Sequence, residues 1–430
     1  MRARLTFREA LSQRVIVADG AMGTMLQAHD LDLDQFEGHE GCNDILNLTR
    51  PDIVHDTHAA FLAVGADCVE TNTFSANYGG LAEYGIQDRA YEIAEAGARV
   101  ARQAADAYST PDHPRYVLGS VGPGTKLPTL GHAPYALLRD HYEQCHRGLI
   151  DGGADAILIE TCQDLLQVKA AVVAAQRARK ALRSDIPIIA QVTIETTGTM
   201  LVGSEIGAAL TSLAPLGIDV VGLNCATGPA EMSEHLRYLS HHSPIPISCM
   251  PNAGLPQLGA DGAVYPLTPA ELADAHDTFT SEFGLSMVGG CCGTTPEHLR
   301  QVAERVQGRG IRNRRPVVEA AASSIYQSVP LRQDASYLAV GERTNANGSK
   351  KFRTAMLEER WDDCVEMRAT RSATAPTCST STSTTWAATA CATCVSWHRA
   401  SRPPRPCRSC STPPSPRSWR PGWRRWAVAR

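Results

Sequence analysis

Whole residue classes are missing from the last part of this 430-residue sequence. Between Arg371 and Arg430 there is no Asp, Glu, Lys, Leu, Ile, Met or Phe, although five of the chain's six tryptophans lie there. A segment without these side chains cannot bury an aliphatic core, so we expect residues 368–430 to form a low-complexity, disordered tail. Because the composition changes abruptly near Met367, we interpret this tail as an out-of-frame translation of GC-rich coding sequence.

The rest of the chain lacks the marks of a membrane-bound, secreted or nucleic-acid-binding protein. No apolar run approaches the length of about 18 residues that a transmembrane helix needs, and the net charge of −4 gives no electrostatic reason to bind nucleic acid. The basic, amphipathic N-terminus has no apolar core or cleavage site of a signal peptide, so we expect a cytoplasmic protein. Thiols stay reduced in that compartment, so the fourteen cysteines are expected to bind metal or to pack in the core.

Eight short apolar runs recur through the first 300 residues and alternate with helix-like segments such as 89–107 and 133–152. This alternation predicts βαβ units with a parallel sheet, and eight units predict a closed (β/α)8 TIM barrel. A doubly wound open sheet is the alternative, but residues 19–23 lack the glycine spacing of a dinucleotide-binding fingerprint. The predicted strands are 15–19, 68–73, 116–121, 156–160, 187–194, 220–224, 246–249 and 285–289.

The remaining sequence predicts further divisions of the chain. The barrel is expected to occupy residues 1–306, and residues 307–336 read as a linker with little periodicity. A new βα module is predicted over 337–367, with a strand at 337–340 and a helix from Lys350 that Ser349 caps. One βα unit cannot bury its own core, so we expect this module to be incomplete.

Three cysteines fall at the carboxyl ends of predicted strands: Cys225 after the sixth, Cys291 and Cys292 after the eighth. In a (β/α)8 barrel these ends converge on one face, and flanking glycines permit the turn that two neighbouring thiols need to share a metal. Three protein ligands with one open position are typical of catalytic zinc, and thiolates favour zinc over magnesium or calcium. The alternative is that all three are ordinary core or oxidised residues. The cysteines without such a setting, which we expect to pack in the core, are Cys42, Cys68, Cys145, Cys162 and Cys249.

The charge of such a site indicates its fourth ligand. Three thiolates around Zn²⁺ leave one net negative charge, which keeps a bound thiolate nucleophilic. The fourth ligand is therefore expected to be a substrate sulfur rather than a hydrolytic water.

Several motifs occur together in one order along the chain. Over about residues 10–305 they resemble the homocysteine-binding domain of zinc-dependent homocysteine methyltransferases. The resemblance implies that Cys225, Cys291 and Cys292 hold Zn²⁺, and that the bound thiol of homocysteine accepts a methyl group to give methionine. The motifs are DGAMGT (19–24), ETNTF (70–74), ETCQD (160–164), NC (224–225) and GGCCGT (289–294).

The resemblance also implies that Asp19 and Glu160 receive the ammonium group of homocysteine, and that glycines near Gly20 admit its carboxylate to backbone amides. Both acidic residues end predicted strands, so both carboxylates can face the barrel mouth. Taken alone, Asp19 could equally cap the next helix, and Glu160 could pair with a nearby Lys or Arg. Asn72 and Asn224 are further candidates, either for substrate binding or for ordering the loops.

Residues 341–352 (GERTNANGSKKF) are similar to the opening of the pterin-binding domain in cobalamin-dependent methionine synthases. In that family homocysteine, folate and cobalamin modules follow in this order, so the resemblance implies methylcobalamin as methyl donor. It also implies 5-methyltetrahydrofolate near Glu342, Arg343 and Asn345. No cobalamin module follows, so we expect the amino-terminal part of a longer enzyme. A stand-alone methyltransferase using S-methylmethionine or betaine, and a non-catalytic zinc-binding fragment, are the alternatives.

Overall fold

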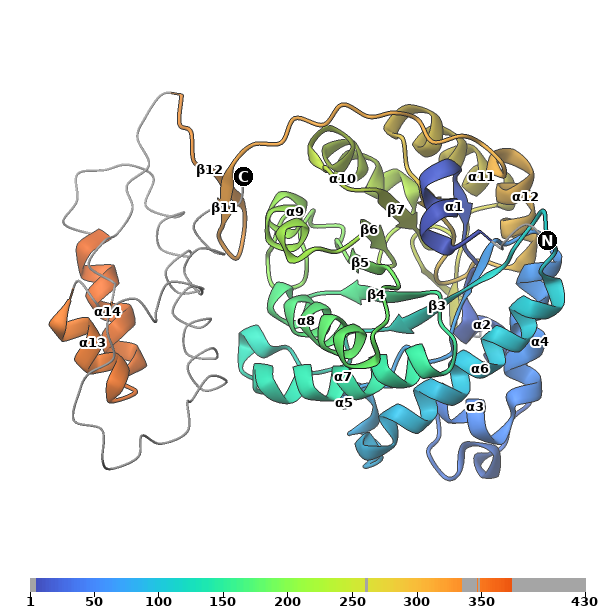
Figure 1. Ribbon diagram of the computed structural model, residues 1–430, viewed down its shortest axis with the longest axis horizontal. Helices are drawn as coiled ribbons and strands as arrows, with labels where there is room; N and C mark the ends of the chain where they lie inside the picture. Colours follow the sequence, from blue (N-terminus) through green and yellow to red (C-terminus); the bar gives the residue numbers. More distant parts are fainter. Residues whose placement is uncertain (1–4, 260–261, 335–345, 347–348, 373–430) are drawn as a thin grey trace. The chain divides into compact units, whose positions relative to one another are not determined.

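The computed structural model describes residues 5–259, 262–334, 346 and 349–372. The chain divides into two compact units, with the boundary between Val318 and Glu319. In the first unit, eight parallel strands form a nearly closed barrel with helices around it (Figure 1). The predicted TIM-barrel fold is therefore confirmed.

All eight predicted strands are present, with bounds that differ by a few residues. Around the barrel they follow the order β1-β10-β7-β6-β5-β4-β3-β2. In chain order they are β1 (Ile16–Val17), β2 (Cys68–Glu70), β3 (Tyr116–Val121), β4 (Ala156–Cys162), β5 (Ile188–Val192), β6 (Val220–Asn224), β7 (Ile247–Met250) and β10 (Met287–Val288).

Side chains cap some helices of the first unit at their start. Asp164 accepts from Leu166 N at the start of α8, and Thr268 forms a capping box with Glu271 at the start of α11. The helices are α1 (Phe7–Gln13), α2 (Met22–Gln27), α3 (Leu46–Thr49), α4 (Pro51–Ala63), α5 (Tyr78–Leu81), α6 (Ala90–Tyr108), α7 (Tyr135–Asp151), α8 (Leu165–Leu182), α9 (Ile206–Leu213), α10 (Pro229–His242), α11 (Pro269–Thr278) and α12 (Pro296–Val306).

Alternate strand residues build two apolar layers. One set, which includes Cys68, Leu118 and Leu158, fills the interior of the barrel. The other set, which includes Val69 and Val117, packs against the helices. The five cysteines predicted to pack in the core, namely Cys42, Cys68, Cys145, Cys162 and Cys249, are all buried.

The seam between β1 and β2 is closed without a strand ladder. These strands stand at the two ends of the strand order, and no ladder joins them in the described part of the chain. At the amino end of the seam, Asp67 N donates to Val17 O at 2.7 Å, and Asp67 Oδ2 accepts from Val17 N at 2.9 Å. At the carboxyl end, both carboxylate oxygens of Asp19 accept from Glu70 N, at 3.1 and 3.0 Å. Two buried aspartates therefore complete the barrel.

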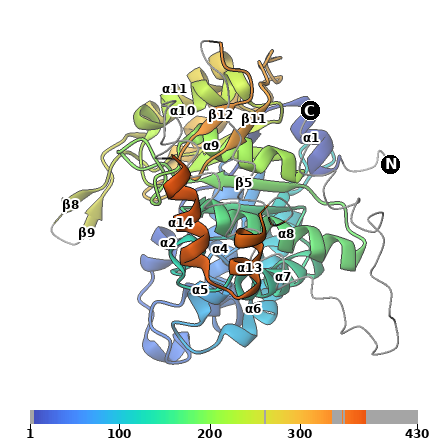
Figure 2. The ribbon, with the colours of Figure 1, turned by 90° about the vertical axis from the view of Figure 1, so that its left-hand side faces the viewer.

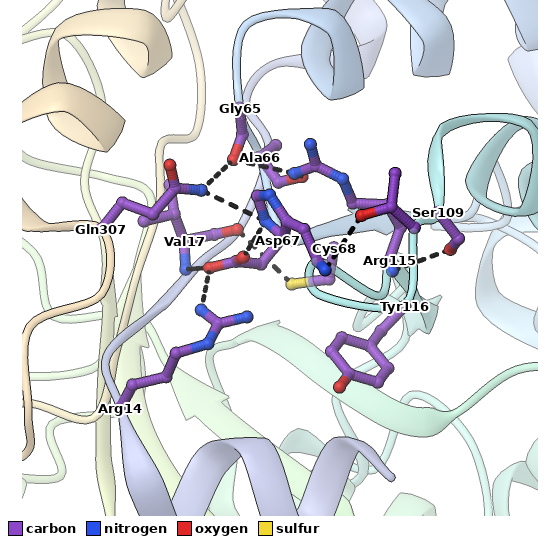
Figure 3. A network of polar contacts seen from close by, with 12 residues as sticks. Arg14, Val17, Gly65, Ala66, Asp67, Cys68, Ser109, Arg115, Tyr116 and Gln307 are labelled. Atoms are coloured by element: carbon purple, nitrogen blue, oxygen red, sulfur yellow. Dashed lines mark hydrogen bonds and ion pairs between the residues drawn. The ribbon is translucent and has the colours of Figure 1, made fainter. Parts of the chain in front are cut away.

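Asp67 is the centre of a polar network at the amino end of the strands (Figure 3). Arg14 Nη1 and His113 Nε2 each lie 2.7 Å from its carboxylate. Burial alone raises the pKa of Asp67, but the hydrogen bonds to His113 and Arg14 bring it below its usual value. Gln307 Nε2 donates to Gly65 O at 2.9 Å, so the residue after α12 is joined to the same network.

Two short strands interrupt the predicted pattern after β7. β8 (Gln257–Gly259) and β9 (Gly262–Val264) form an antiparallel hairpin that projects from the barrel (Figure 2). Leu258 on this hairpin is 99% exposed. Strands of three residues are too short for hydrophobic periodicity to reveal them.

The second unit also differs from expectation. A β-hairpin of β11 (Ala321–Ser323) and β12 (Ser328–Pro330) lies in the segment predicted as a linker. The helix predicted from Lys350 to about Met367 is two helices, α13 (Lys350–Leu357) and α14 (Trp361–Ser372), and between them Glu359 has a φ of +58°. The predicted strand at 337–340 and the tail from residue 373 lie outside the described residues. No helix among the described residues is long and apolar enough to cross a membrane.

Replacing Asp67 with Asn is expected to lower the free energy of unfolding by about 3 kcal/mol, because Arg14 loses the buried charge that it pairs with. Urea unfolding followed by circular dichroism measures this loss. Asp52→Asn removes an exposed partner of Arg50 and serves as the control, with an expected change below about 1 kcal/mol. Equal losses in the two variants would contradict the role of the network.

The same network predicts a dependence on pH. The folded-state pKa of Asp67 is depressed, so its stabilising contribution is present above its unfolded pKa of about 3.9 and is lost as pH falls through the folded value. The stability difference between wild type and Asp67→Asn should therefore shrink in acid and stay constant near neutrality.

Candidate functional site

Three cysteine side chains meet at the carboxyl end of the barrel strands. Cys225 follows β6, Cys291 and Cys292 follow β10, and their Sγ atoms all lie within 4.8 Å of one another. Cys225 Sγ and Cys292 Sγ are 3.8 Å apart. Two sulfurs bound at about 2.3 Å to a tetrahedral zinc ion are also separated by roughly 3.8 Å, so the donor set fits zinc. Among the described residues this is the only cluster of three or more metal-ligating side chains.

The backbone leaves strand geometry at both cysteine segments, as the sequence predicted for the cysteine pair. Gly293 has a φ of +78°, while Gly290 is needed for close packing, because a Cβ there would lie 2.5 Å from Thr294 Oγ1. Cys225 and Ala226 have φ values of +60° and +58°, a left-handed conformation that costs about 1 kcal/mol or more per non-glycine residue. Strain of this kind persists only where surrounding contacts fix the backbone.

The end of β7 and the loop after it supply those contacts. Cys225 N donates to Met250 O at 3.1 Å, and Cys291 N donates to Pro251 O at 2.8 Å. Cys292 N donates to Asn252 Oδ1 at 3.1 Å. Three consecutive residues, 250–252, therefore hold both cysteine segments in register.

The thiols share their protons unequally. The pKa of Cys292 lies far below its usual value, because hydrogen bonds from Cys225 and Cys291 stabilise its thiolate. The pKa of Cys291 is raised well above its usual value by its hydrogen bonds to Cys225 and Cys292 and by burial. The cluster is therefore an electron-rich sulfur site even before a cation is considered.

Two buried carboxylates, those of Asp19 and Glu160, lie at the same end of the barrel. Asp19 is 1% exposed and Glu160 is 4% exposed. Burial raises the pKa of Asp19 well above its usual value and the pKa of Glu160 to about 7. Asn224, the residue before Cys225, donates its Nδ2 to Glu160 Oε2, which places this carboxylate beside the start of the cysteine segment.

The two structural alternatives for these carboxylates are wrong. The N-cap of α2 is Ala21, and no side chain caps that helix, so Asp19 is not its cap. Glu160 accepts from the Ser120 hydroxyl and from Asn224 Nδ2, the latter at 2.9 Å, and pairs with no described Lys or Arg.

The two candidate asparagines have different surroundings. Asn224 also donates to Thr161 Oγ1 at 2.8 Å and accepts from Thr161 N at 2.7 Å, so it fixes the end of β4 beside Glu160. Asn72 Nδ2 donates to Asn43 O at 2.7 Å and to Asn47 Oδ1 at 3.1 Å. These contacts of Asn72 are those of a residue that orders loops.

Gly20 packs the loop after β1 against the cysteine loop. A Cβ at Gly20 would lie 2.5 Å from Thr294 Oγ1, and the next residue, Ala21, donates its N–H to the same oxygen at 3.2 Å. The folate candidates Glu342, Arg343 and Asn345 lie outside the described residues.

Comparison with known proteins identifies the family. Residues 16–306 match the family model described as homocysteine S-methyltransferase. This chain belongs to the homocysteine S-methyltransferase family. The barrel, with its cysteine cluster and buried carboxylates, is the part that carries the match.

Curated relatives of this chain include two proteins named methionine synthase. The one from Mycobacterium tuberculosis (strain ATCC 25618 / H37Rv) is 60% identical over 359 residues, which cover 84% of this chain and 30% of that protein. The one from Mycobacterium leprae (strain TN) is 58% identical over 364 residues, with the same coverage of 84% and 30%. The chain therefore spans about 30% of the length of these relatives.

Solved structures support the fold. The metallated form of the homocysteine methyltransferase MmuM from Escherichia coli has a TM-score of 0.55 at 21% identity, covering 68% of this chain and 96% of that one. The apo form has a TM-score of 0.52 at 21% identity, with the same coverage of 68% and 96%.

Sequence reasoning missed two residues of this candidate site. Asn252 follows β7, and its side-chain amide accepts from Cys292 N, a role that an isolated asparagine in a loop does not reveal in the sequence. Glu70 ends β2, and its Oε1 is buried without a hydrogen-bond partner among the described residues. A carboxylate at the carboxyl end of a barrel strand was the available signal for Glu70.

Replacing Gly293 with Ala is expected to destabilise the cysteine loop. The new Cβ would lie 2.2 Å from the Tyr265 ring, and the φ of +78° adds strain. Gly308→Ala is a matched control, because Gly308 has a φ of +74° but no atom within 4 Å of its Cβ position. Gly308→Ala should cost about 1–2 kcal/mol, whereas Gly293→Ala should cost more and lower the melting temperature further. Similar melting temperatures for the two variants would show that the Tyr265 contact has no importance.

Proposed function

We propose that this chain binds Zn²⁺ through Cys225, Cys291 and Cys292 and that it activates the thiol of homocysteine for methyl transfer, giving methionine. The observation that carries the proposal is the zinc-like 3.8 Å spacing of two sulfurs in a cluster with one ligand position left open. Zinc, when bound, deprotonates a coordinating thiol and keeps the resulting thiolate nucleophilic at neutral pH.

The protein side chains orient the substrate. Asp19 and Glu160 accept hydrogen bonds from its ammonium group. Neither carboxylate forms an ion pair with a described Lys or Arg. Asn224 and Ser120 hold the Glu160 carboxylate in place. An amino acid anchored there presents its thiol toward Cys292, whose charge acts on Glu160. Burial of the anchor excludes water from these contacts and strengthens them.

The proposed methyl donor is methylcobalamin, regenerated from 5-methyltetrahydrofolate. The 60% identity to a methionine synthase supports this donor over small onium compounds. The proposal includes a barrel over residues 1–306, a linker over 307–336 and the start of a pterin-binding module over 337–367. We assign residues 368–430 to the frame-shifted tail. It also includes a cytoplasmic location, where the thiols stay reduced.

Zinc X-ray absorption tests the central claim. The zinc-loaded chain should show three sulfur ligands, and addition of L-homocysteine should produce a fourth. Cys292→Ser should lose stoichiometric zinc, whereas Cys145→Ala, which removes a buried thiol of α7, should retain it. A first shell that gains no sulfur on addition of homocysteine would falsify the proposed function.

The purified chain is expected to form no methionine from homocysteine and 5-methyltetrahydrofolate. The reason is that its resemblance to a pterin-binding domain stops after the first helix. Mass-spectrometric detection of labelled methionine gives the answer, with added methylcobalamin as donor in a parallel reaction. Labelled methionine formed by the purified chain from 5-methyltetrahydrofolate would contradict this expectation.

A further inference from the structure

A third carboxylate faces the substrate end of the barrel. Cys68 belongs to the interior layer and Val69 to the layer beneath the helices, so Glu70 projects to the interior on the same face as Cys68. Its backbone N–H donates to both oxygens of Asp19, which places it directly beside that carboxylate. Glu70 as a whole is partly exposed, but its Oε1 is buried and has no hydrogen-bond partner among the described residues.

Asp19, Glu70 and Glu160 form a group of acidic side chains without a cation. Burial, followed by the charges of Glu160 and Asp19, raises the pKa of Glu70 well above its usual value. No Lys, Arg or His among the described residues offsets this charge. A buried carboxylate without a donor is costly, so the group favours a protonated carboxyl when empty and the charged form when a positively charged donor enters.

The spacing favours a molecular cation over a metal ion. Among the described residues only the three cysteines bring their ligand atoms within 4.8 Å of one another, so the three carboxylates are set more widely than the ligands of one metal. An alkylammonium group is larger than a bare ion and carries three N–H donors that point in different directions.

We propose that Glu70 is a specificity-determining residue for the amino group of the substrate, accepting one ammonium N–H while Asp19 and Glu160 accept the others. This inference rests on the proposed function, since it takes homocysteine as the ligand. In this role, the ammonium group of the substrate donates to Glu70 Oε1, which has no donor among the described residues. Glu70 acts on recognition of the amino acid end and does not touch the reacting sulfur.

Binding of two thiols to the zinc-loaded full chain distinguishes this role from a structural one. L-Homocysteine carries the amino group, and 4-mercaptobutanoic acid has the same thiol and carboxylate without it. Glu70→Gln keeps the shape of the side chain but removes the charge. It should weaken homocysteine binding by about 10- to 100-fold, the worth of a charged hydrogen bond, and should change binding of 4-mercaptobutanoic acid by less than about 2-fold.

Asp44→Asn is the matched control, because Asp44 is also a buried carboxylate with a raised pKa but bonds to Ser75 N in a neighbouring loop. It should leave the ratio of the two affinities unchanged. Glu70→Asp, which keeps the charge but withdraws it by one methylene, should give an intermediate loss for homocysteine alone. This variant decides the question if Glu70→Gln fails to fold, as judged by circular dichroism and zinc content.

Equal losses for both thiols, or no loss for homocysteine, would overturn the role of Glu70 while leaving the proposed function intact. Failure of the wild-type chain to bind homocysteine through zinc would instead remove the proposed function. The two failures are therefore distinguishable in a single set of titrations.

Discussion

The hydrogen bonds that close the β1–β2 seam are the interactions on which the remaining structure depends. Seven neighbouring strand pairs are joined by parallel ladders. At this seam, hydrogen bonds to the side chains of Asp67 and Asp19 join the two strands instead, one at each end. Asp67 is secured by Arg14 and His113, so the amino end of the barrel is fixed independently of the site. Asp19 has no such cation, which leaves its charge available at the opposite end.

A small number of hydrogen bonds to the backbone also positions the cysteine cluster. The sulfurs come from two loops, and residues 250–252, at the end of β7 and in the loop after it, lie between them and bond to both. The left-handed φ values at Cys225 and Ala226 are tolerated because these bonds fix the chain on either side. A strained, immobile frame suits a site in which three sulfurs must keep their spacing when a ligand arrives.

Much of the fold could be read from the sequence, because each barrel strand is a buried apolar run and the chemistry falls at the strand ends. The convergence of Cys225 with Cys291 and Cys292 followed from that rule alone. The hairpin of β8 and β9 could not be predicted, since three-residue strands leave no periodic signal. The position of Glu70 beside Asp19 was equally hidden, because the two residues are 51 positions apart in sequence. Glu359 in a left-handed turn divides the single helix that was predicted from Lys350 to about Met367.

Asp19 combines a structural role with a proposed role in binding. Its carboxylate holds the first strand to the second, and the same buried carboxylate is the proposed acceptor for the substrate's ammonium group. A change at this position that altered ligand preference would also loosen the wall of the barrel. Closure of the barrel therefore restricts which side chains this position can accept, whatever ligand the site binds.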